Sequence, residues 1–176
     1  MSGKVFGIGL SKTGTTSLHH ALTQLGFKGK HYPQHFELFE CDFSPLDAYD
    51  AVTDIPAAAY YSQLDEVFPG SKFVLTVRDI NDWLASMERW LAPGRRPNAF
   101  MLQMRLVVYG AVKFDRSRFK YVYERHFEEV THHFRGRSDD LLVMNICAGD
   151  GWEKLCAFLD KPTPKRDFPF IIPGQP

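Results

Sequence analysis

The stretch "GIGLSKTGTTSLHHAL", residues 7–22, decides the fold class of this chain. It begins inside an apolar run, residues 5–10, that is typical of a buried strand. It continues into residues 15–25, where apolar side chains recur with the spacing of one helix face. Two glycines, Gly9 and Gly14, bracket four residues between these segments. A strand, a glycine-bracketed loop and a helix in this order form the frame of a phosphate-binding loop.

The position of the lysine separates this loop from that of the nucleoside triphosphatases. Those loops place lysine directly after the second glycine, whereas here Thr15 takes that place and Lys12 stands inside the loop. The start of a helix still offers free backbone N–H groups and a partial positive charge. The hydroxyls of Thr13, Thr15, Thr16 and Ser17 add further donors. We therefore expect a phosphate at this helix start, the alternative being a purely structural tight turn.

Composition indicates an ordinary globular protein. The chain has 176 residues, of which 44% are hydrophobic and 24% charged, and we expect a single domain over residues 1–176. The formal net charge is zero, which argues against an extended nucleic-acid or membrane surface. No signal peptide or membrane span is evident, and the cysteines Cys41, Cys147 and Cys156 lack metal-site spacing. We expect a cytoplasmic protein with free thiols and no bound metal.

The remaining chain alternates between strand and helix patterns. We expect strands at 51–54, 72–77 ("KFVLTV") and 141–146 ("LLVMNI"), helices at 57–68, 80–91, 98–113, 116–135 and 151–159, and a loop at 92–98. The continuous, β-branched strand at 72–77 is typical of a parallel sheet. The alternation predicts a three-layer α/β/α fold with a central parallel sheet.

The loop also resembles a known family motif. Residues 10–18, "LSKTGTTSL", resemble the 5'-phosphosulfate loop of the sulfotransferases that use 3'-phosphoadenosine-5'-phosphosulfate (PAPS), usually written P-K-S-G-T-T-W-L. The family lysine lies two residues before the glycine, as Lys12 does before Gly14. The resemblance implies that Lys12, Gly14 and the neighbouring hydroxyl residues hold the 5'-phosphosulfate. Ser17 departs from the family tryptophan that stacks on adenine, so adenine must be held otherwise.

Further segments resemble the same family. In "LTVRDINDWLAS", residues 75–86, an arginine ends a strand and a serine follows eight positions later, which implies a 3'-phosphate site at Arg78 and Ser86. In "VTDIP", residues 52–56, Asp54 takes the place of the general-base histidine of K-T-H-L-P. Residues 149–164 resemble a C-terminal segment that packs beside the cofactor in a short bacterial-type branch.

The implied reaction is metal-independent transfer of a sulfuryl group from PAPS to a hydroxyl or amine of a small-molecule acceptor. A sulfuryl group carries less charge than a phosphoryl group, so Lys12 and helix N–H donors could stabilise the leaving oxygen without Mg²⁺. Asp54 is the predicted base, and His20 and His35 are alternatives. His35 would need a return strand through Tyr32 to bring it back to the site. His31 is expected only in the loop after the first helix.

Two other functions stay open at this point. A small-molecule kinase could use Asp54 as a Mg²⁺ ligand, although it lacks the lysine after Gly14. A non-catalytic module could bind an adenosine bisphosphate through the same loop. The chain is short for a sulfotransferase, so a second subunit in a homodimer could complete the acceptor site. The acceptor itself does not follow from the sequence.

Overall fold

The computed structural model describes residues 3–92, 94 and 97–171. It contains a five-stranded sheet in the order β2-β3-β1-β4-β5, in which all neighbouring strands are parallel. The strands are β1 (Val5–Gly7), β2 (Gly29–His31), β3 (Ala51–Thr53), β4 (Lys72–Thr76) and β5 (Leu141–Met144). The helices are α1 (Thr15–Gln24), α2 (Ile55–Ala59), α3 (Tyr61–Val67), α4 (Ile80–Leu91), α5 (Ala99–Tyr109), α6 (Arg116–His133) and α7 (Trp152–Leu159).

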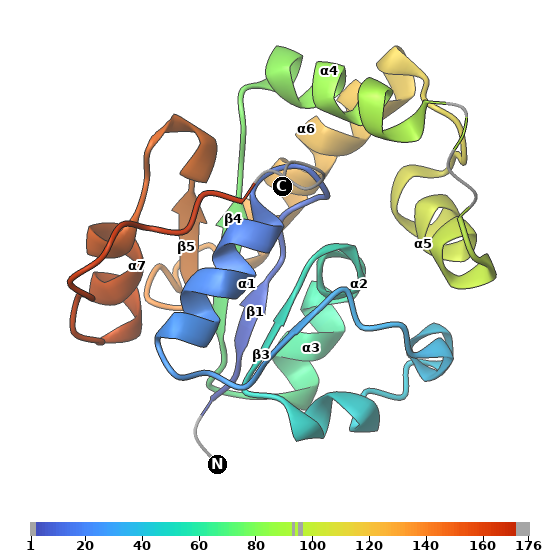
Figure 1. Ribbon diagram of the computed structural model, residues 1–176. Helices are drawn as coiled ribbons and strands as arrows, with labels where there is room; N and C mark the ends of the chain where they lie inside the picture. The colour runs from blue at the N-terminus through green and yellow to red at the C-terminus, as the bar shows by residue number, and fades with distance from the viewer. Residues whose placement is uncertain (1–2, 93, 95–96, 172–176) are drawn as a thin grey trace.

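Each face of the sheet carries its own apolar core. Consecutive strand residues point to opposite faces, so Val5 packs with α1 and α7 while its neighbour Phe6 packs with α3 and α6. Figure 1 shows α1 and α7 in front of the sheet and α6 behind it. This arrangement confirms the predicted three-layer fold with a central parallel sheet.

A third apolar cluster lies beyond the carboxyl ends of the strands. It joins α2, α4, α5 and α6 around buried Trp83, Phe100 and Tyr109. In Figure 1 α4 and α5 stand above and beside the upper ends of β1 and β4. The loops that leave the strands at this end therefore pack against a rigid helical wall.

The structure differs from the sequence-based expectations in several places. β2 was not among the expected strands, the strand predicted at residues 5–10 ends at Gly7, and the strand predicted at 141–146 ends at Met144. The helix predicted at 98–113 ends at Tyr109, because Gly110 adopts the left-handed conformation that ends helices. The helix predicted at 57–68 is two helices, because Asp54 caps α2 early and Tyr60 leaves the helical backbone to pack between two cores. In the loop predicted at 92–98, Pro93, Arg95 and Arg96 lie outside the described residues.

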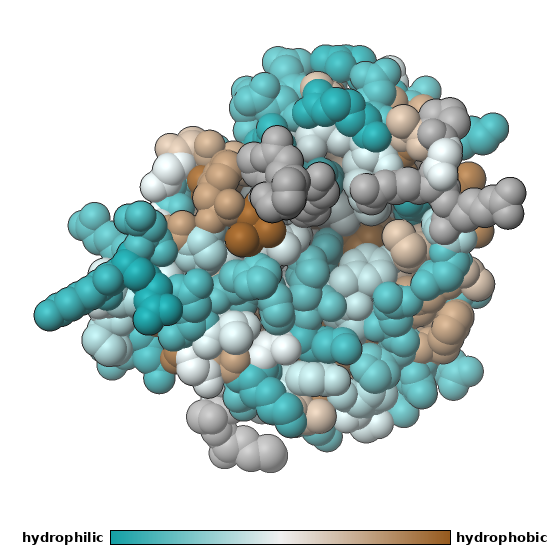
Figure 2. Space-filling view, in the orientation of Figure 1, coloured by the Kyte–Doolittle hydropathy of each residue, from teal (hydrophilic) through white to brown (hydrophobic). Residues whose placement is uncertain are grey.

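The surface is mostly polar. Hydrophilic side chains cover much of the face seen in Figure 2, and hydrophobic ones appear in smaller groups left of the centre and along the right edge. Leu106 and Val107 of α5 are among the exposed apolar residues. Within residues 3–92, 94 and 97–171, no helix is long and apolar enough to span a membrane.

Candidate active site

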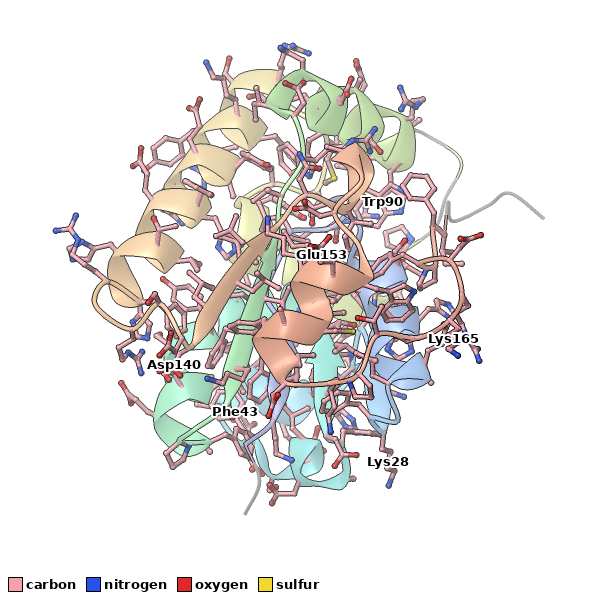
Figure 3. All side chains as sticks on the ribbon, turned by 90° about the vertical axis from the view of Figure 1, so that its left-hand side faces the viewer. Lys28, Phe43, Trp90, Asp140, Glu153 and Lys165 are labelled. Atoms are coloured by element: carbon pink, nitrogen blue, oxygen red, sulfur yellow. The ribbon has the colours of Figure 1, made fainter. Side chains whose placement is uncertain are left out.

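A cavity of about 590 Å³ opens at the carboxyl ends of the strands. Its lining comes from the segments after all five strands, from α4 and α5, and from the C-terminal tail: Ser11, Lys12, Gly14, Thr15, Thr16, Ser17, His31, Tyr32, Gln34, Asp54, Arg78, Asp82, Ser86, Arg89, Trp90, Met101, Ile146, Cys147, Phe170 and Ile171. In Figure 3 Trp90 marks this end, while Phe43, Asp140 and Lys28 lie at the opposite end. Open parallel sheets bind ligands at this edge.

The glycine loop, defined here as residues 8–14, is held tightly from behind. A Cβ added to Gly9 would come within 1.9 Å of Thr76 Oγ1, so only glycine fits beside β4. Trp83 Nε1 of α4 donates to the Ser11 carbonyl at 2.8 Å, and the Ser11 N–H donates to the Tyr109 hydroxyl at 3.3 Å. The loop is therefore preorganised by the sheet and by the helical wall.

Thr13 and the other predicted loop residues play different structural parts. The Thr13 hydroxyl donates to the Leu10 carbonyl at 2.6 Å and lies 2.6 Å from Thr76 Oγ1, in a fully buried position. Its side chain thus braces the loop from beneath. Lys12, Gly14 and the three following hydroxyl residues, Thr15, Thr16 and Ser17, line the cavity.

The start of α1 is suited to an anion. Gly14, with φ of 104°, is the N-cap residue, and no side chain caps the helix. The first N–H groups of any α-helix lack intrahelical partners, and they add to the positive end of the helix dipole. Lys12 lines the cavity beside them. The arrangement can hold one phosphate or sulfate group.

Arg78 and Ser86 line the same cavity from the end of β4 and from α4. The backbone of Arg78 is fixed by the Tyr123 hydroxyl, which accepts from its N–H at 2.9 Å and donates to its carbonyl at 2.6 Å. Arg78 Nη1 reaches the Lys12 carbonyl at 3.4 Å, whereas its buried Nε has no hydrogen-bond partner among the described residues. A second anion would satisfy this donor.

Asp54 lies directly after β3, next to the glycine loop, because β3 pairs with β1. Its Oδ1 accepts from the Ile55 N–H at 2.8 Å and from the Ser11 hydroxyl at 3.0 Å. Its backbone adopts φ 85° and ψ −176°, a region that non-glycine residues rarely occupy. Lys12 (φ 71°) and Tyr32 (φ 48°) also line the cavity with positive φ. Such strained residues cluster at functional sites.

His31 is one of the cavity residues that the sequence did not predict, and it is the one that contacts Asp54. As the last residue of β2 it lies beside Thr53, whose Oγ1 is 2.8 Å from His31 Nδ1. Its Nε2 lies 3.3 Å from Asp54 Oδ2 and 3.3 Å from Thr16 Oγ1. Burial lowers the pKa of His31 below its ordinary value, although the Asp54 carboxylate acts in the opposite direction.

The two histidines considered as alternative bases lie elsewhere. His20 is exposed on α1, and His35 precedes the turn η1 (Phe36–Glu40); neither lines the cavity. A strand that returns to the carboxyl edge was needed to bring a histidine to the site. β2 is that strand, and it delivers His31.

Aromatic side chains form much of the remaining wall. Trp90 lines the cavity and carries the Arg105 guanidinium against its ring, with 4.9 Å between the guanidinium carbon and the ring centroid. Phe170 and Ile171 of the tail reach the cavity, and the Ile171 N–H donates to Ser17 Oγ at 2.9 Å. Burial raises the pKa of Tyr32 to about 12, so its hydroxyl stays protonated at neutral pH.

Potential metal ligands are dispersed in the part of the chain that the structure describes. No group of three or more His, Cys, Asp or Glu side chains there is arranged to hold a metal ion. Cys41 and Cys147 are exposed and Cys156 is buried, and all three are free thiols.

Comparison with known proteins identifies the family of this chain. The model of the sulfotransferase domain family matches residues 4–44 and 42–172. "Ava biosynthesis cluster protein M" from Aspergillus versicolor is 30% identical over 213 residues, covering 96% of this chain and 80% of that protein. The alignment is longer than the 176-residue chain, so the relative carries additional residues between matched segments. The matches cover the glycine loop, Asp54, Arg78 and the tail, and the chain belongs to the sulfotransferase domain family.

Proposed function

We propose that this protein transfers a sulfuryl group from PAPS to a hydroxyl or amine of a small-molecule acceptor, as a single sulfotransferase-like domain. The observation that carries the proposal is that two sets of groups suited to anions line one cavity. Lys12 and the start of α1 form one site, and Arg78 with Ser86 forms the other. PAPS carries a 5'-phosphosulfate and a 3'-phosphate, so it has one anionic group for each set of residues. A mononucleotide without the 3'-phosphate has no group for Arg78 and Ser86.

In this proposal the protein supplies charge stabilisation and a proton acceptor. The acceptor oxygen or nitrogen bonds to sulfur while the bond from sulfur to the 5'-phosphate oxygen breaks. The electron pair of the broken bond stays on the phosphate, where Lys12 and the N–H groups of α1 stabilise the developing charge. The acceptor proton goes to Asp54, whose Oδ2 is the oxygen left without the Ile55 and Ser11 hydrogen bonds.

Adenine needs a partner other than the family tryptophan, which is Ser17 here. The Ser17 hydroxyl instead accepts from the Ile171 N–H, and this bond brings the tail over the start of α1. Phe170 lines the cavity beside it and is 58% exposed. We assign Phe170 to one face of adenine, since stacking on an aromatic ring is the usual way to hold a base.

The acceptor must be small. One cavity of about 590 Å³ has to hold both substrates, and pockets for a single drug-sized ligand range over roughly 300–1,000 Å³. Tyr32, Gln34 and Met101 also line the cavity.

The kinase alternative has weaker support. A Mg²⁺ site would need Asp54 oxygens facing the phosphates, but Oδ1 accepts two hydrogen bonds from the protein and Oδ2 faces His31. The non-catalytic alternative shares both anion sites and differs only in turnover. Binding and turnover therefore have to be measured separately.

Calorimetry with 3'-phosphoadenosine-5'-phosphate in the presence of a chelator tests the nucleotide site. We expect binding without metal and much weaker binding of ATP. Loss of binding in chelator, or equal affinity for ATP, would favour the kinase. An acceptor screen with sulfur-labelled PAPS then tests turnover, and tight nucleotide binding with no labelled product from any hydroxyl or amine acceptor would favour the binding module.

A further inference from the structure

His31, which lines the cavity beside Asp54, has a more specific role than its position on a short edge strand suggests. We propose that Asp54 and His31 act as one proton-accepting pair. In this pair Asp54 takes the proton from the acceptor, and His31 positions the carboxylate and receives the proton from it. The inference rests on the proposed sulfuryl transfer and adds a residue and a proton path to it.

The imidazole ring of His31 is held against the Asp54 carboxylate. His31 Nε2 lies 3.3 Å from Asp54 Oδ2, the one carboxylate oxygen that the Ile55 N–H and the Ser11 hydroxyl leave open. The opposite nitrogen, Nδ1, is 2.8 Å from Thr53 Oγ1, which belongs to the strand that carries Asp54. The ring is thus fixed from behind and faces the carboxylate.

The His31 ring has hydrogen-bond partners in every protonation state. Both ring nitrogens contact hydroxyls, Thr53 Oγ1 at Nδ1 and Thr16 Oγ1 at Nε2. A hydroxyl can donate or accept, so either neutral tautomer keeps its hydrogen bonds. The doubly protonated ring finds acceptors on both sides, with the Asp54 carboxylate beside Nε2. A proton can therefore arrive at His31 without leaving a buried polar group unpaired.

The acidities of the two groups favour movement of the proton from Asp54 to His31. A carboxylic acid is ordinarily a stronger acid than an imidazolium by about 2 pKa units or more. The charged and titratable groups that face His31 are Asp54 from the β3–α2 junction and His19 and His20 from α1. Burial and, to a smaller extent, His20 lower the pKa of His31, so the ring is neutral at pH 7, while the Asp54 carboxylate beside Nε2 raises the pKa and favours the protonated ring.

Each bond broken in the transfer is matched by a bond formed. The acceptor O–H or N–H bond breaks, its electron pair forms the bond to sulfur, and the electrons of the cleaved S–O bond remain on the 5'-phosphate of the donor. The proton moves to Asp54 Oδ2 and from there to His31 Nε2, which leaves a carboxylate beside an imidazolium. Water takes the proton from His31 before the next turnover.

His31→Asn tests this role, because asparagine can still bond to Thr53 but has no titratable ring. We expect turnover to fall about 10–100-fold with little change in the affinity for 3'-phosphoadenosine-5'-phosphate. His35→Asn is the matched control, since His35 lies outside the cavity, and it should retain wild-type turnover. Wild-type turnover should decline as pH falls through the lowered pKa of His31, and the His31→Asn variant should lack this decline.

The double variant Asp54→Asn/His31→Asn tests whether the two residues form a unit. We expect it to be no slower than Asp54→Asn alone, because residues on one proton path are not additive. Imidazole NMR gives a readout besides activity: the pKa of His31 should fall further in Asp54→Asn, where the carboxylate charge is gone.

The outcomes separate this inference from the proposed function. A folded wild-type protein without transfer to any acceptor would overturn both. If the wild type transfers sulfuryl groups but His31→Asn keeps the wild-type turnover or pH profile, only the proposed pair is overturned. Additive losses of turnover in the double variant would also overturn the pair and leave the proposed function standing. A His31 pKa that is the same in wild type and Asp54→Asn would also overturn it.

Discussion

Asp54 holds a backbone conformation that its capping role does not require. An N-cap aspartate usually has ordinary extended dihedral angles, whereas Asp54 has φ 85° and ψ −176°. A residue held in such a region costs about 1–3 kcal/mol and persists only where the surroundings enforce it. Here the surroundings are Ser11 of the glycine loop and His31, which engage one carboxylate oxygen each. The strain is therefore coupled to the placement of the carboxylate in the cavity.

Asp54→Asn should separate this role from a structural one. Asparagine keeps the size of the side chain and an oxygen for the Ile55 and Ser11 donors but cannot accept the acceptor proton. We expect turnover to fall by about 10²–10⁴-fold, the usual contribution of a general base, while nucleotide affinity stays nearly constant. Calorimetry and initial-rate measurements check this. A lower melting temperature with an unchanged rate per folded molecule would reduce Asp54 to a capping residue.

Arg78→Ala should report on the second anion site. The buried Nε of Arg78 has no partner among the described residues, and a charge-assisted hydrogen bond to a phosphate is worth about 1.5–3 kcal/mol. We expect affinity for 3'-phosphoadenosine-5'-phosphate to fall roughly 10–150-fold. Affinity for adenosine 5'-phosphate, measured in the same titrations, should hardly change. Equal weakening of both nucleotides would show that Arg78 only supports the glycine loop through the Lys12 carbonyl.

At the scale of elements, strong apolar patterns were predictable and a short polar strand was not. "KFVLTV" has the continuous apolar run of a central strand, and it forms β4 between β1 and β5. β2 has only three residues, Gly29–His31, none of them apolar, and it is an edge strand paired with β3 alone. Its register comes from tertiary pairing, so no local pattern marks it. Because His31 ends this strand, its place in the site was equally hidden.

The glycine loop and β4 form one unit, and Gly9→Ala should disrupt it. A Cβ at residue 9 would lie 1.9 Å from Thr76 Oγ1 and 2.6 Å from the Thr76 carbonyl oxygen. Overpacking usually costs about 1–3 kcal/mol, and we expect at least the upper end because one obstacle is backbone. Urea denaturation measures the loss. Gly151→Ala is the matched control, since its Cβ would approach nothing closer than 3.4 Å. Equal stability of both variants would contradict the close packing of the loop.

At the scale of the whole molecule, the predicted site residues meet because of the parallel topology. Carboxyl ends of parallel strands share one edge, so residues that follow different strands converge there. From the sequence alone, this rule predicts that Lys12, Asp54 and Arg78 lie close together, and all three line one cavity. It gives no information on side-chain partners. The Thr13 hydroxyl points away from the cavity because it packs against Thr76 of β4. The Ser17 hydroxyl bonds to the tail because residues 170–171 return to the start of α1.

The same burial that shapes the site should make the whole fold sensitive to mild acid. The pKa of His19 is lowered to about 4, chiefly by burial, and the pKa values of His31 and His126 are lowered for the same reason. These rings stay neutral in the folded state while they bind protons near pH 6.5 in the unfolded chain. The unfolded state then binds more protons, so stability is complete above about pH 6.5 and falls as pH drops toward 4.

Urea denaturation at pH 7, 6 and 5 checks this last prediction. Carboxyl groups titrate mostly near pH 4 and below, so histidines should dominate the slope in this range. We expect His19→Gln to reduce the loss of unfolding free energy between pH 7 and 5, because the side chain that resists protonation is gone. His132→Gln is the matched control on exposed α6 surface and should keep the wild-type slope. Stability that is flat from pH 7 to 5 in the wild type would mean that these rings accept protons without unfolding.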